Sequence, residues 1–253
     1  MKLIEVYEYI NSFAPFATQA DFDNAGFLVG DREAEFTGGV VALDVTSGAI
    51  EYAKSIGANL IVSHHPVIFD PLREVTSHSL VYKLIESGIS VISAHTNLDR
   101  AEGGINDVLC ELLELQNVKG VLPDGEIFEA RVGELPTELT PDEFGNLLTA
   151  CFPQTAIKYV AGNRNVKRVG VCSGAGGSQL SGMIAEGVDA FVTADVKHNV
   201  FLEAAESGLS LYDCGHYSTE DIIVSPLTEK LNQKFGGFSE YHSDLIKSVI
   251  SEE

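Results

Sequence analysis

Long apolar stretches are absent from this sequence of 253 residues. A helix that crosses a bilayer needs about 18 or more consecutive apolar residues, and no segment reaches that length. The opening residues, MKLIEVYEYINSF, carry Glu5 and Glu8 inside their apolar pattern, so they lack the unbroken hydrophobic stretch of a secretory signal. We therefore expect a cytoplasmic protein with no membrane-spanning segment.

Basic residues are also scarce. The chain has 16 Lys and Arg against 37 Asp and Glu, which gives a net charge of -21 with neutral histidines. A surface of this sign repels the phosphate backbone of DNA and RNA at long range. We therefore expect no nucleic-acid partner.

The few cysteines show no metal-binding or redox spacing. The four lie far apart with no CxxC pair, as is typical of reduced thiols in a cytosolic protein. We interpret them as small buried residues, with a thiolate metal site and a cysteine nucleophile as the alternatives. They are Cys110, Cys151, Cys172 and Cys214.

One pattern recurs along the chain: a helix end, a glycine, a short apolar strand and then a cluster of polar residues. The glycine suits a left-handed helix C-cap, and the apolar runs suit strands buried on both faces. Helices that alternate with buried strands predict an α/β fold with mostly parallel sheets. The four clearest copies are 53–65, 83–99, 184–198 and 203–216.

This pattern predicts two related α/β lobes rather than one long sheet. Segments 39–99 and 165–216 each read strand, helix, strand, helix, strand. We place the first lobe at 1–120 and the second at 121–253, and leave open that the C-terminal segment packs back on the first lobe.

A mixed segment lies between the two repeated halves. Residues 120–160 read as a connector with a strand, a turn at Pro136 and then a helix. Thr140 is the expected cap of that helix, with Pro141 at its first position and Glu143 at its third.

Titratable side chains follow the predicted strands, at the ends where an open parallel sheet forms its binding crevice. His64 and His65 come after the strand LIVS, and Pro66 then keeps the chain extended. Neighbouring imidazoles can serve one metal ion each when the chain turns. The alternative is a pair of loop histidines, one exposed and one packed.

A second pair of candidate ligands lies in HYSTE (216–220). If a helix begins there, His216 and Glu220 project from the same face, as metal-binding pairs do. The order differs from HExxH, so the zincin protease template does not apply. The alternative makes Ser218 a helix cap and Glu220 a partner of the helix dipole.

Asp99, in the polar loop after the strand VISA, completes a set of three histidines and two carboxylates at strand ends. Such a mixed nitrogen and oxygen set suits Zn, Mn, Fe, Co or Ni better than Ca or Mg. Five ligands exceed what one tetrahedral catalytic site uses, and a carboxylate can bridge two ions about 3.5–4 Å apart. We therefore predict two divalent transition-metal ions at the strand C-terminal ends, between the lobes.

Several motifs resemble those of the Nif-three-like dinuclear metal proteins, also known as the GTP cyclohydrolase 1 type 2 family. They span almost the whole chain and read DNAGFLVGD (23–31), VALDVT (41–46), SHHPVIFDPL (63–72), AHTNLDRAEGGIND (94–107), VTADVKH (192–198) and CGHYSTE (214–220). The resemblance implies a two-lobed α/β subunit and a toroidal homohexamer whose sites face an inner cavity. It also implies that His64, His65, Asp99, His216 and Glu220 hold two metals, with one histidine of the doublet on each and the glutamate bridging them.

The chain departs from this family in three places. Many bacterial relatives carry an inserted middle domain, for which the connector is too short. Relatives often read TGD or TGE where this chain reads TAD, and a second histidine where it has Asn199, so we leave Asp195 and His198 out of the predicted site. Cys214 stands where alanine is frequent, and is either an oxidation-sensitive neighbour of His216 or simply a small residue.

The resemblance implies hydrolysis of GTP or a related nucleotide: hydroxide supplied by the metals attacks C8 of guanine and opens its ring, and formate is lost in a second step. His95 is a candidate for transferring protons or orienting a ligand, with a packed strand-end histidine as the alternative. Asp44 and Asn24 are candidates for shaping the surroundings of the site. The glycine-rich SGAGGS (173–178) reads as a tight turn, with an anion cradle as the alternative.

Two other functions fit the same predicted ligands. One is a non-catalytic hexameric scaffold whose metals are saturated by protein, and the other is a metal-dependent nucleotide phosphoesterase. Exchangeable positions on the metals separate the first from an enzyme, and the released product separates the second from a cyclohydrolase.

Overall fold

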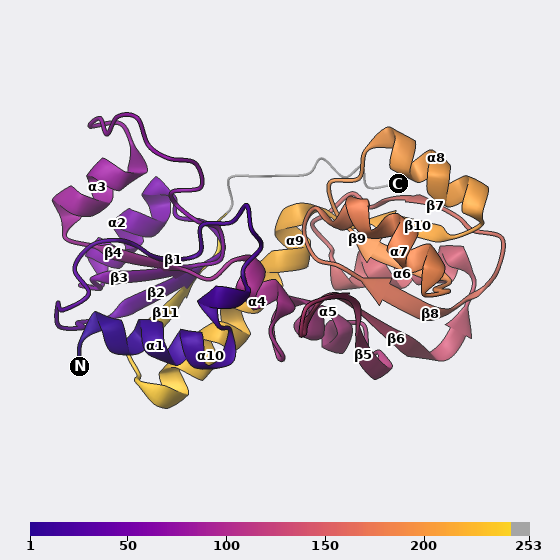
Figure 1. Cartoon of the computed structure of the whole chain (residues 1–253), viewed down its shortest axis with the longest axis horizontal. Coiled ribbons are helices and arrows are strands. Elements are labelled where there is room, and N and C mark those ends of the chain that lie inside the picture. The colour runs from indigo at the N-terminus through magenta and orange to yellow at the C-terminus, as the bar shows by residue number, and fades with distance from the viewer. Residues whose placement is uncertain (244–253) are drawn as a thin grey trace. The chain divides into compact units, whose positions relative to one another are not determined.

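The computed structural model of the chain describes residues 1–243. These residues form two compact units, each with its own sheet and helices (Figure 1). Of the described residues, the first unit contains Met1–Glu102 together with 223–243, and the second contains Gly103–Ile222. Two α/β units confirm the predicted fold class.

The first unit is built on a five-stranded sheet. Its strands are β1 (Gly26–Val29), β2 (Gly39–Ala42), β3 (Leu60–Ser63), β4 (Ser90–Ser93) and β11 (Phe238–Tyr241), in the order β1-β4-β3-β2-β11. All neighbours pair in parallel except β1, which runs antiparallel to β4. The helices are α1 (Leu3–Phe13), η1 (Phe16–Thr18), α2 (Ser47–Ser55), α3 (Leu80–Ser87), α4 (Thr96–Arg100) and α10 (Val224–Lys234).

Strand alternation gives this unit three layers. Val40, Ile61 and Val91 pack with α2 and α3 in one core, so the residues beside them in each strand point to the other face. Every residue of β2, β3 and β4 is buried, as predicted for strands covered on both faces. In Figure 1, α2 and α3 lie on one face of the sheet, and α1 and the yellow helix α10 lie on the other.

The second unit is built on a six-stranded sheet. Its strands are β5 (Gln116–Asp124), β6 (Ile127–Leu139), β7 (Lys158–Val160), β8 (Val166–Val171), β9 (Ala190–Thr193) and β10 (Ser210–Asp213), in the order β5-β6-β8-β9-β10-β7. Strands β8, β9 and β10 run parallel, and the others join them antiparallel. The helices are α5 (Ile105–Leu112), α6 (Pro141–Cys151), η2 (Gly176–Gln179), α7 (Leu180–Ala185), α8 (His198–Ser207) and α9 (His216–Glu220), with η3 (Asp221–Ile223) at the unit boundary.

Two separate cores cover the faces of this second sheet. Phe144 of α6 and Leu109 of α5 lie in one core with Val169 of β8. Met183 of α7 and Ala204 of α8 lie in the other. The strand and helix order of β2–α2–β3–α3–β4 thus recurs as β8–α7–β9–α8–β10, which is the internal repeat read from the sequence.

The boundary between the units lies after Glu102, whereas the sequence placed it near residue 120. The segment that follows Glu102 belongs to the second unit because Leu109 and Cys110 enter its core and β5 pairs with β6. The C-terminal segment returns to the first unit because β11 pairs in parallel with β2.

Residues 120–160 are part of the second sheet and its core rather than a connector. The turn expected at Pro136 is wrong, because β6 continues through it with an irregular register between Glu134 and Leu139. Proline fits a strand at such an irregularity because it has no N–H to donate to the ladder. The next helix begins as predicted: the Thr140 hydroxyl accepts from the Glu143 N–H, and the Glu143 carboxylate accepts from the Thr140 N–H.

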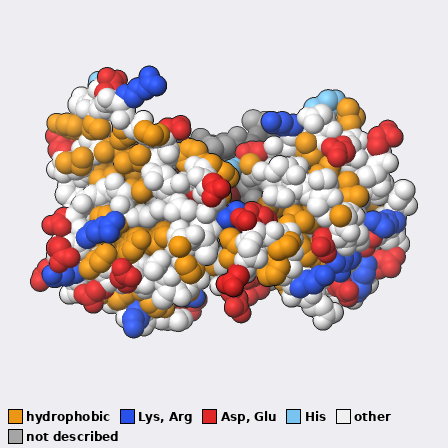
Figure 2. All heavy atoms as spheres, viewed as in Figure 1, with side chains coloured by type: hydrophobic (Ala, Val, Ile, Leu, Met, Phe, Trp, Pro, Cys, Tyr) orange, Lys and Arg blue, Asp and Glu red, His pale blue; other side chains and the backbone are white. Residues whose placement is uncertain are grey.

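The surface carries scattered charges with some apolar patches. Hydrophobic side chains gather over α3 of the first unit (Figure 2), where Ile85 is 63% exposed. Among residues 1–243, no helix is long and apolar enough to cross a membrane.

Candidate metal centre

Three imidazoles gather at the carboxyl ends of β3 and β4 in the first unit. The main-chain N–H of His64 donates to the Ala42 carbonyl at 3.2 Å, and that of His65 donates to the Leu43 carbonyl at 3.0 Å. Pairing with the chain of β2 therefore continues past the end of β3. The ring of His95, which follows β4, lies 5.1 Å from that of His64 and 5.6 Å from that of His65 between centroids. One nitrogen of each ring lies within 4.8 Å of the other two. We call these three residues the histidine cluster.

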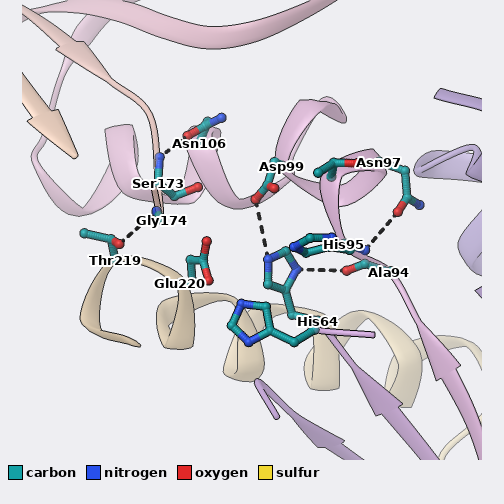
Figure 3. A network of polar contacts seen from close by, with 12 residues as sticks. His64, Ala94, His95, Asn97, Asp99, Asn106, Ser173, Gly174, Thr219 and Glu220 are labelled. Carbon is teal, nitrogen blue, oxygen red and sulfur yellow. Dashed lines mark hydrogen bonds and ion pairs between the residues drawn. The ribbon is translucent and has the colours of Figure 1, made fainter. Parts of the chain in front are cut away.

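A main-chain carbonyl fixes the tautomer of His64. Its Nδ1 lies 2.8 Å from the Ala94 carbonyl oxygen, which can only accept, so Nδ1 carries a proton (Figure 3). In the neutral ring the lone pair is then on Nε2, which lies 3.7 Å from Asp99 Oδ1. The His64 side chain is 1% exposed. A buried imidazole lone pair next to a carboxylate is a donor pair suited to a cation.

Carboxylates hold the other two rings of the cluster. His65 Nδ1 lies 2.7 Å from Asp44 Oδ1, and His95 Nδ1 lies 2.7 Å from Asp23 Oδ1. A neutral histidine that donates Nδ1–H to a carboxylate presents its Nε2 lone pair, the usual arrangement around metal-binding imidazoles. Asp44, which the sequence offered without a definite role, therefore orients His65.

Asp23 is a residue that the sequence did not single out. Its side chain is fully buried, and Oδ2 accepts from the Thr96 N–H at 3.1 Å and from the Thr96 hydroxyl at 2.5 Å. Burial raises the pKa of this carboxyl, but the hydrogen bonds from His95 and Thr96 outweigh burial and lower the pKa to about 2. Asp23 is therefore an ionised acceptor that fixes the ring of His95.

The second unit places its two predicted ligands together. Helix α9 begins at His216, and His216 Nε2 lies 2.9 Å from Glu220 Oε2. The alternative role of Ser218 as the helix cap is wrong, because the cap position is Gly215 and Ser218 instead shares a hydrogen bond with Thr155. The Glu220 side chain is 5% exposed, so its carboxylate faces the protein rather than solvent.

Asp195 is a supporting residue of this second pair, although the sequence led us to leave it out. Its Oδ2 lies 2.8 Å from Nδ1 of His216, so it orients that ring as Asp44 orients His65. Asp195 has a φ of 51°, a left-handed conformation that is uncommon outside glycine and concentrates at functional sites. His198, also left out, is the exposed first residue of α8.

The glycine-rich loop after β8 packs its backbone against the buried carboxylate. The Gly174 N–H donates to the Thr219 hydroxyl at 3.1 Å, and the Ser173 N–H donates to Asn106 Oδ1 at 2.8 Å (Figure 3). Gly174 has a φ of +58°, and a Cβ added there would lie 2.0 Å from Glu220 Oε1. The loop therefore forms a cradle that a side chain would fill, and it turns into η2 as the tight-turn interpretation predicted.

Cys214 is a packing residue of the second unit. It is fully buried in the same core as Tyr212, and burial raises the pKa of its thiol well above the usual range. A buried neutral thiol is a poor nucleophile and a poor metal ligand. This environment favours the small-residue interpretation over that of an oxidation-sensitive neighbour.

The donors in each unit fit transition-metal ions. Four imidazoles have Nδ1 next to an oxygen acceptor of the same unit, so Nε2 is the nitrogen placed to bind a metal, and in His216 it lies 2.9 Å from Glu220 Oε2. Imidazole nitrogen together with carboxylate oxygen favours Zn, Fe, Mn, Co or Ni. The predicted ligands occur as two groups, His64, His65 and Asp99 in the first unit and His216 and Glu220 in the second.

The motifs that carry these groups match a known family over almost the full chain. The sequence profile of Duf34/NIF3 (NGG1p interacting factor 3) matches residues 1–249. The chain belongs to the Duf34/NIF3 family. This confirms the family resemblance found in the motifs.

Individual relatives of this Duf34/NIF3 protein agree with that assignment. A protein of Clostridium perfringens named GTP cyclohydrolase 1 type 2 homolog is 33% identical over 252 residues, which cover 95% of each chain. Reduced HcgD from Methanocaldococcus jannaschii is a similar solved structure, with 30% identity, a TM-score of 0.82, and coverage of 97% of this chain and 98% of that one. A Bacillus cereus protein related to NIF3 has the same fold, with a TM-score of 0.88 at 20% identity over 100% of this chain and 99% of that one.

Proposed function

We propose that this Duf34/NIF3 protein is a dinuclear metal-dependent hydrolase that acts on the guanine ring of GTP or a related nucleotide. The proposed ligands are His64, His65, Asp99, His216 and Glu220, so the first unit and the second each supply part of one centre. The name GTP cyclohydrolase 1 type 2 homolog, carried by relatives, supports the substrate class.

One observation carries this proposal: each candidate imidazole is held through Nδ1 by a fixed oxygen. The acceptors are the Ala94 carbonyl for His64, Asp44 for His65 and Asp195 for His216. Imidazoles that only fill space have no need of a common tautomer, whereas metal ligands require their Nε2 lone pairs to be available. The common arrangement in both units is therefore evidence for metal binding.

Two bound divalent ions would supply hydroxide at neutral pH and polarise the bond that is attacked. The protein's own part is to orient and to move protons. His95, fixed by the ionised Asp23, lies in the histidine cluster with Nε2 available to take up or deliver a proton. Phe69 packs edge-on against His95 with 6.1 Å between centroids and limits solvent on that side of the ring.

Elemental analysis tests the metal centre. We expect about two transition-metal ions per wild-type chain and loss of most of both in Glu220→Ala, because the proposed centre shares that carboxylate. His198→Ala is the matched control, since it removes an exposed imidazole from the same unit. Full retention of one ion in Glu220→Ala would show that the first unit binds metal by itself, and the absence of metal from wild type and variant alike would end the dinuclear proposal.

Product analysis separates the three functions that the ligands allow. A cyclohydrolase loses guanine absorbance and releases formate from GTP, whereas a phosphoesterase releases inorganic phosphate and leaves the base intact. A scaffold keeps its metals and releases neither formate nor inorganic phosphate from GTP. We expect loss of guanine absorbance with wild type and none with His64→Ala, and equal rates in the two would indicate a contaminating enzyme.

The homohexamer and the cytoplasmic location stay predictions from the family resemblance and the sequence. Size measurement by light scattering tests the first, and cell fractionation tests the second.

A further inference from the structure

Two exposed phenylalanines stand beside the histidine cluster in the first unit. The Phe22 side chain is 69% exposed and that of Phe69 is 47% exposed. Their ring centroids lie 6.4 Å apart at an interplanar angle of 53°. Folding alone does not account for this pair, because leaving two large apolar rings in water forgoes the free energy that their burial would give.

Hydrogen bonds from the neighbouring residues fix this pair relative to the cluster. Asp23, the residue after Phe22, holds His95 through its carboxylate at 2.7 Å. Asn24 donates from Nδ2 to the Ile68 carbonyl, the residue before Phe69, at 2.6 Å. The loop that carries Phe22 is therefore tied both to the cluster and to the loop that carries Phe69.

The contact between Phe69 and His95 makes the aromatic surface continuous with the cluster. Their rings meet edge to face, with 6.1 Å between centroids and an interplanar angle of 84°. A flat ligand that stacks on Phe69 or Phe22 would therefore have its edge close to the imidazoles. Aromatic side chains stack on nucleobases of any kind, because every base has a π-face.

The charge around the pair selects which part of a nucleotide binds there. Asp21 precedes Phe22, Asp70 follows Phe69, and both acidic residues are exposed. Carboxylates at this rim repel phosphate but not a neutral heterocycle. A flat uncharged ring is the ligand that fits both the apolar faces and the acidic rim.

We propose that Phe22 and Phe69 form a stacking site for the purine ring of a nucleotide, next to His95. The proposal rests on the proposed function, since it assigns the guanine ring to this side of the cluster. It makes the two phenylalanines specificity-determining residues that select nucleotides over phosphoesters without an aromatic base. It also places the ring, rather than the phosphates, against the imidazoles of the first unit.

The chain contains no tryptophan, so a single substitution supplies a fluorescent reporter. In the metal-loaded full chain, Phe22→Trp and Phe69→Trp should each be quenched by guanosine, and neither by ribose 5-phosphate. Phe128→Trp is the matched control, because Phe128 is 40% exposed and belongs to the other unit. A second pair, Phe22→Leu and Phe69→Leu, should keep wild-type metal content while the dissociation constant for guanosine rises about tenfold, within the range expected for loss of one stacked base.

The outcomes distinguish this proposal from the one on which it rests. Turnover of GTP by wild type, with no quenching by guanosine at either tryptophan, would overturn the stacking site and leave the hydrolase intact. Quenching without turnover would support the stacking site and overturn the hydrolase. Emission that depends on protein concentration and not on guanosine would show that a second copy covers the rings, which also overturns the stacking site.

Discussion

Replacement of Gly174 by alanine should remove metal from the protein, and it should cost the fold little beyond the strain of alanine in the left-handed region. The added Cβ would lie 2.0 Å from Glu220 Oε1 and 3.3 Å from His216 Nε2. A separation of 2.0 Å is impossible, so one of the two partners has to move. Glu220 Oε1 is the end of a flexible side chain, whereas Gly174 is tied by its N–H to Thr219. We therefore expect the carboxylate to swing away and the loop to stay.

The expected loss of stability and the expected loss of metal affinity follow from this movement of the carboxylate. Alanine in the left-handed region costs about 1–2 kcal/mol wherever it occurs. Displacing the carboxylate removes a proposed ligand, and even groups that only support a ligand are worth about 10–100-fold in metal affinity. Gly187 gives a matched control in the same unit, because its φ is +69° and a Cβ there would meet nothing within 4 Å. Gly187→Ala should therefore show the backbone cost alone.

Two measurements test this reasoning on the purified variants. Urea unfolding of chelator-treated protein should give free energies for Gly174→Ala and Gly187→Ala that agree within about 1 kcal/mol, both below wild type. Metal retained after dialysis against a competing chelator should be near wild type in Gly187→Ala and much lower in Gly174→Ala. Wild-type metal affinity in Gly174→Ala would refute the placement of Glu220. A far larger loss of stability than in Gly187→Ala would show that the backbone gives way instead.

Three further predictions use other parts of the structure. Asp195→Ala should weaken metal binding by about 10–100-fold with little change in unfolding free energy, as read from chelator competition, because its carboxylate is largely exposed and acts through an imidazole. Iodoacetamide at pH 8 should leave Cys110 and Cys214 unmodified until urea unfolds the chain, as read by mass spectrometry, because burial raises both pKa values and that of Cys110 reaches about 12. The folded-state pKa of Asp23 is about 2, below its ordinary 3.8, so its ionisation stabilises the fold above pH 4 and this contribution is lost as the pH falls through 2. The stability gap between wild type and Asp23→Asn should therefore shrink by about 2 kcal/mol between pH 5 and pH 2, and a constant gap would contradict the lowered pKa.

Local sequence signals were sufficient for the predicted helix and strand order. The glycines after the helices take the left-handed C-cap conformation at Gly88 and Gly208, and the apolar run that follows each glycine is a buried strand. The spacing of His216 and Glu220 was informative for the same reason, because a single helical turn decides whether they meet. Features determined within one turn or one strand can be read from neighbouring residues.

Features that depend on distant pairing could not be read in this way. Asp23 orients a histidine 72 positions away, and nothing in FDN distinguishes that carboxylate from a surface aspartate. The boundary was placed near residue 120 for a related reason, since nothing in residues 103–119 shows that they pack and pair with elements that come later in the chain. Asp195 did have a usable signal, its position just after a predicted strand, and the comparison with TGD and TGE motifs outweighed it.

The internal repeat gives the two units different capacities for metal. In each unit the third parallel strand leads to a histidine followed four positions later by a carboxylate, His95 and Asp99 in the first and His216 and Glu220 in the second. The preceding strand differs, because β3 is followed by two histidines whereas β9 is followed by Ala194 and the supporting Asp195. Within the described residues of the second unit, no third histidine, cysteine or carboxylate reaches ligand distance of both His216 and Glu220. Two donors rarely hold a transition metal firmly, so the second unit alone should bind such an ion more weakly than the first unit, where three imidazoles gather.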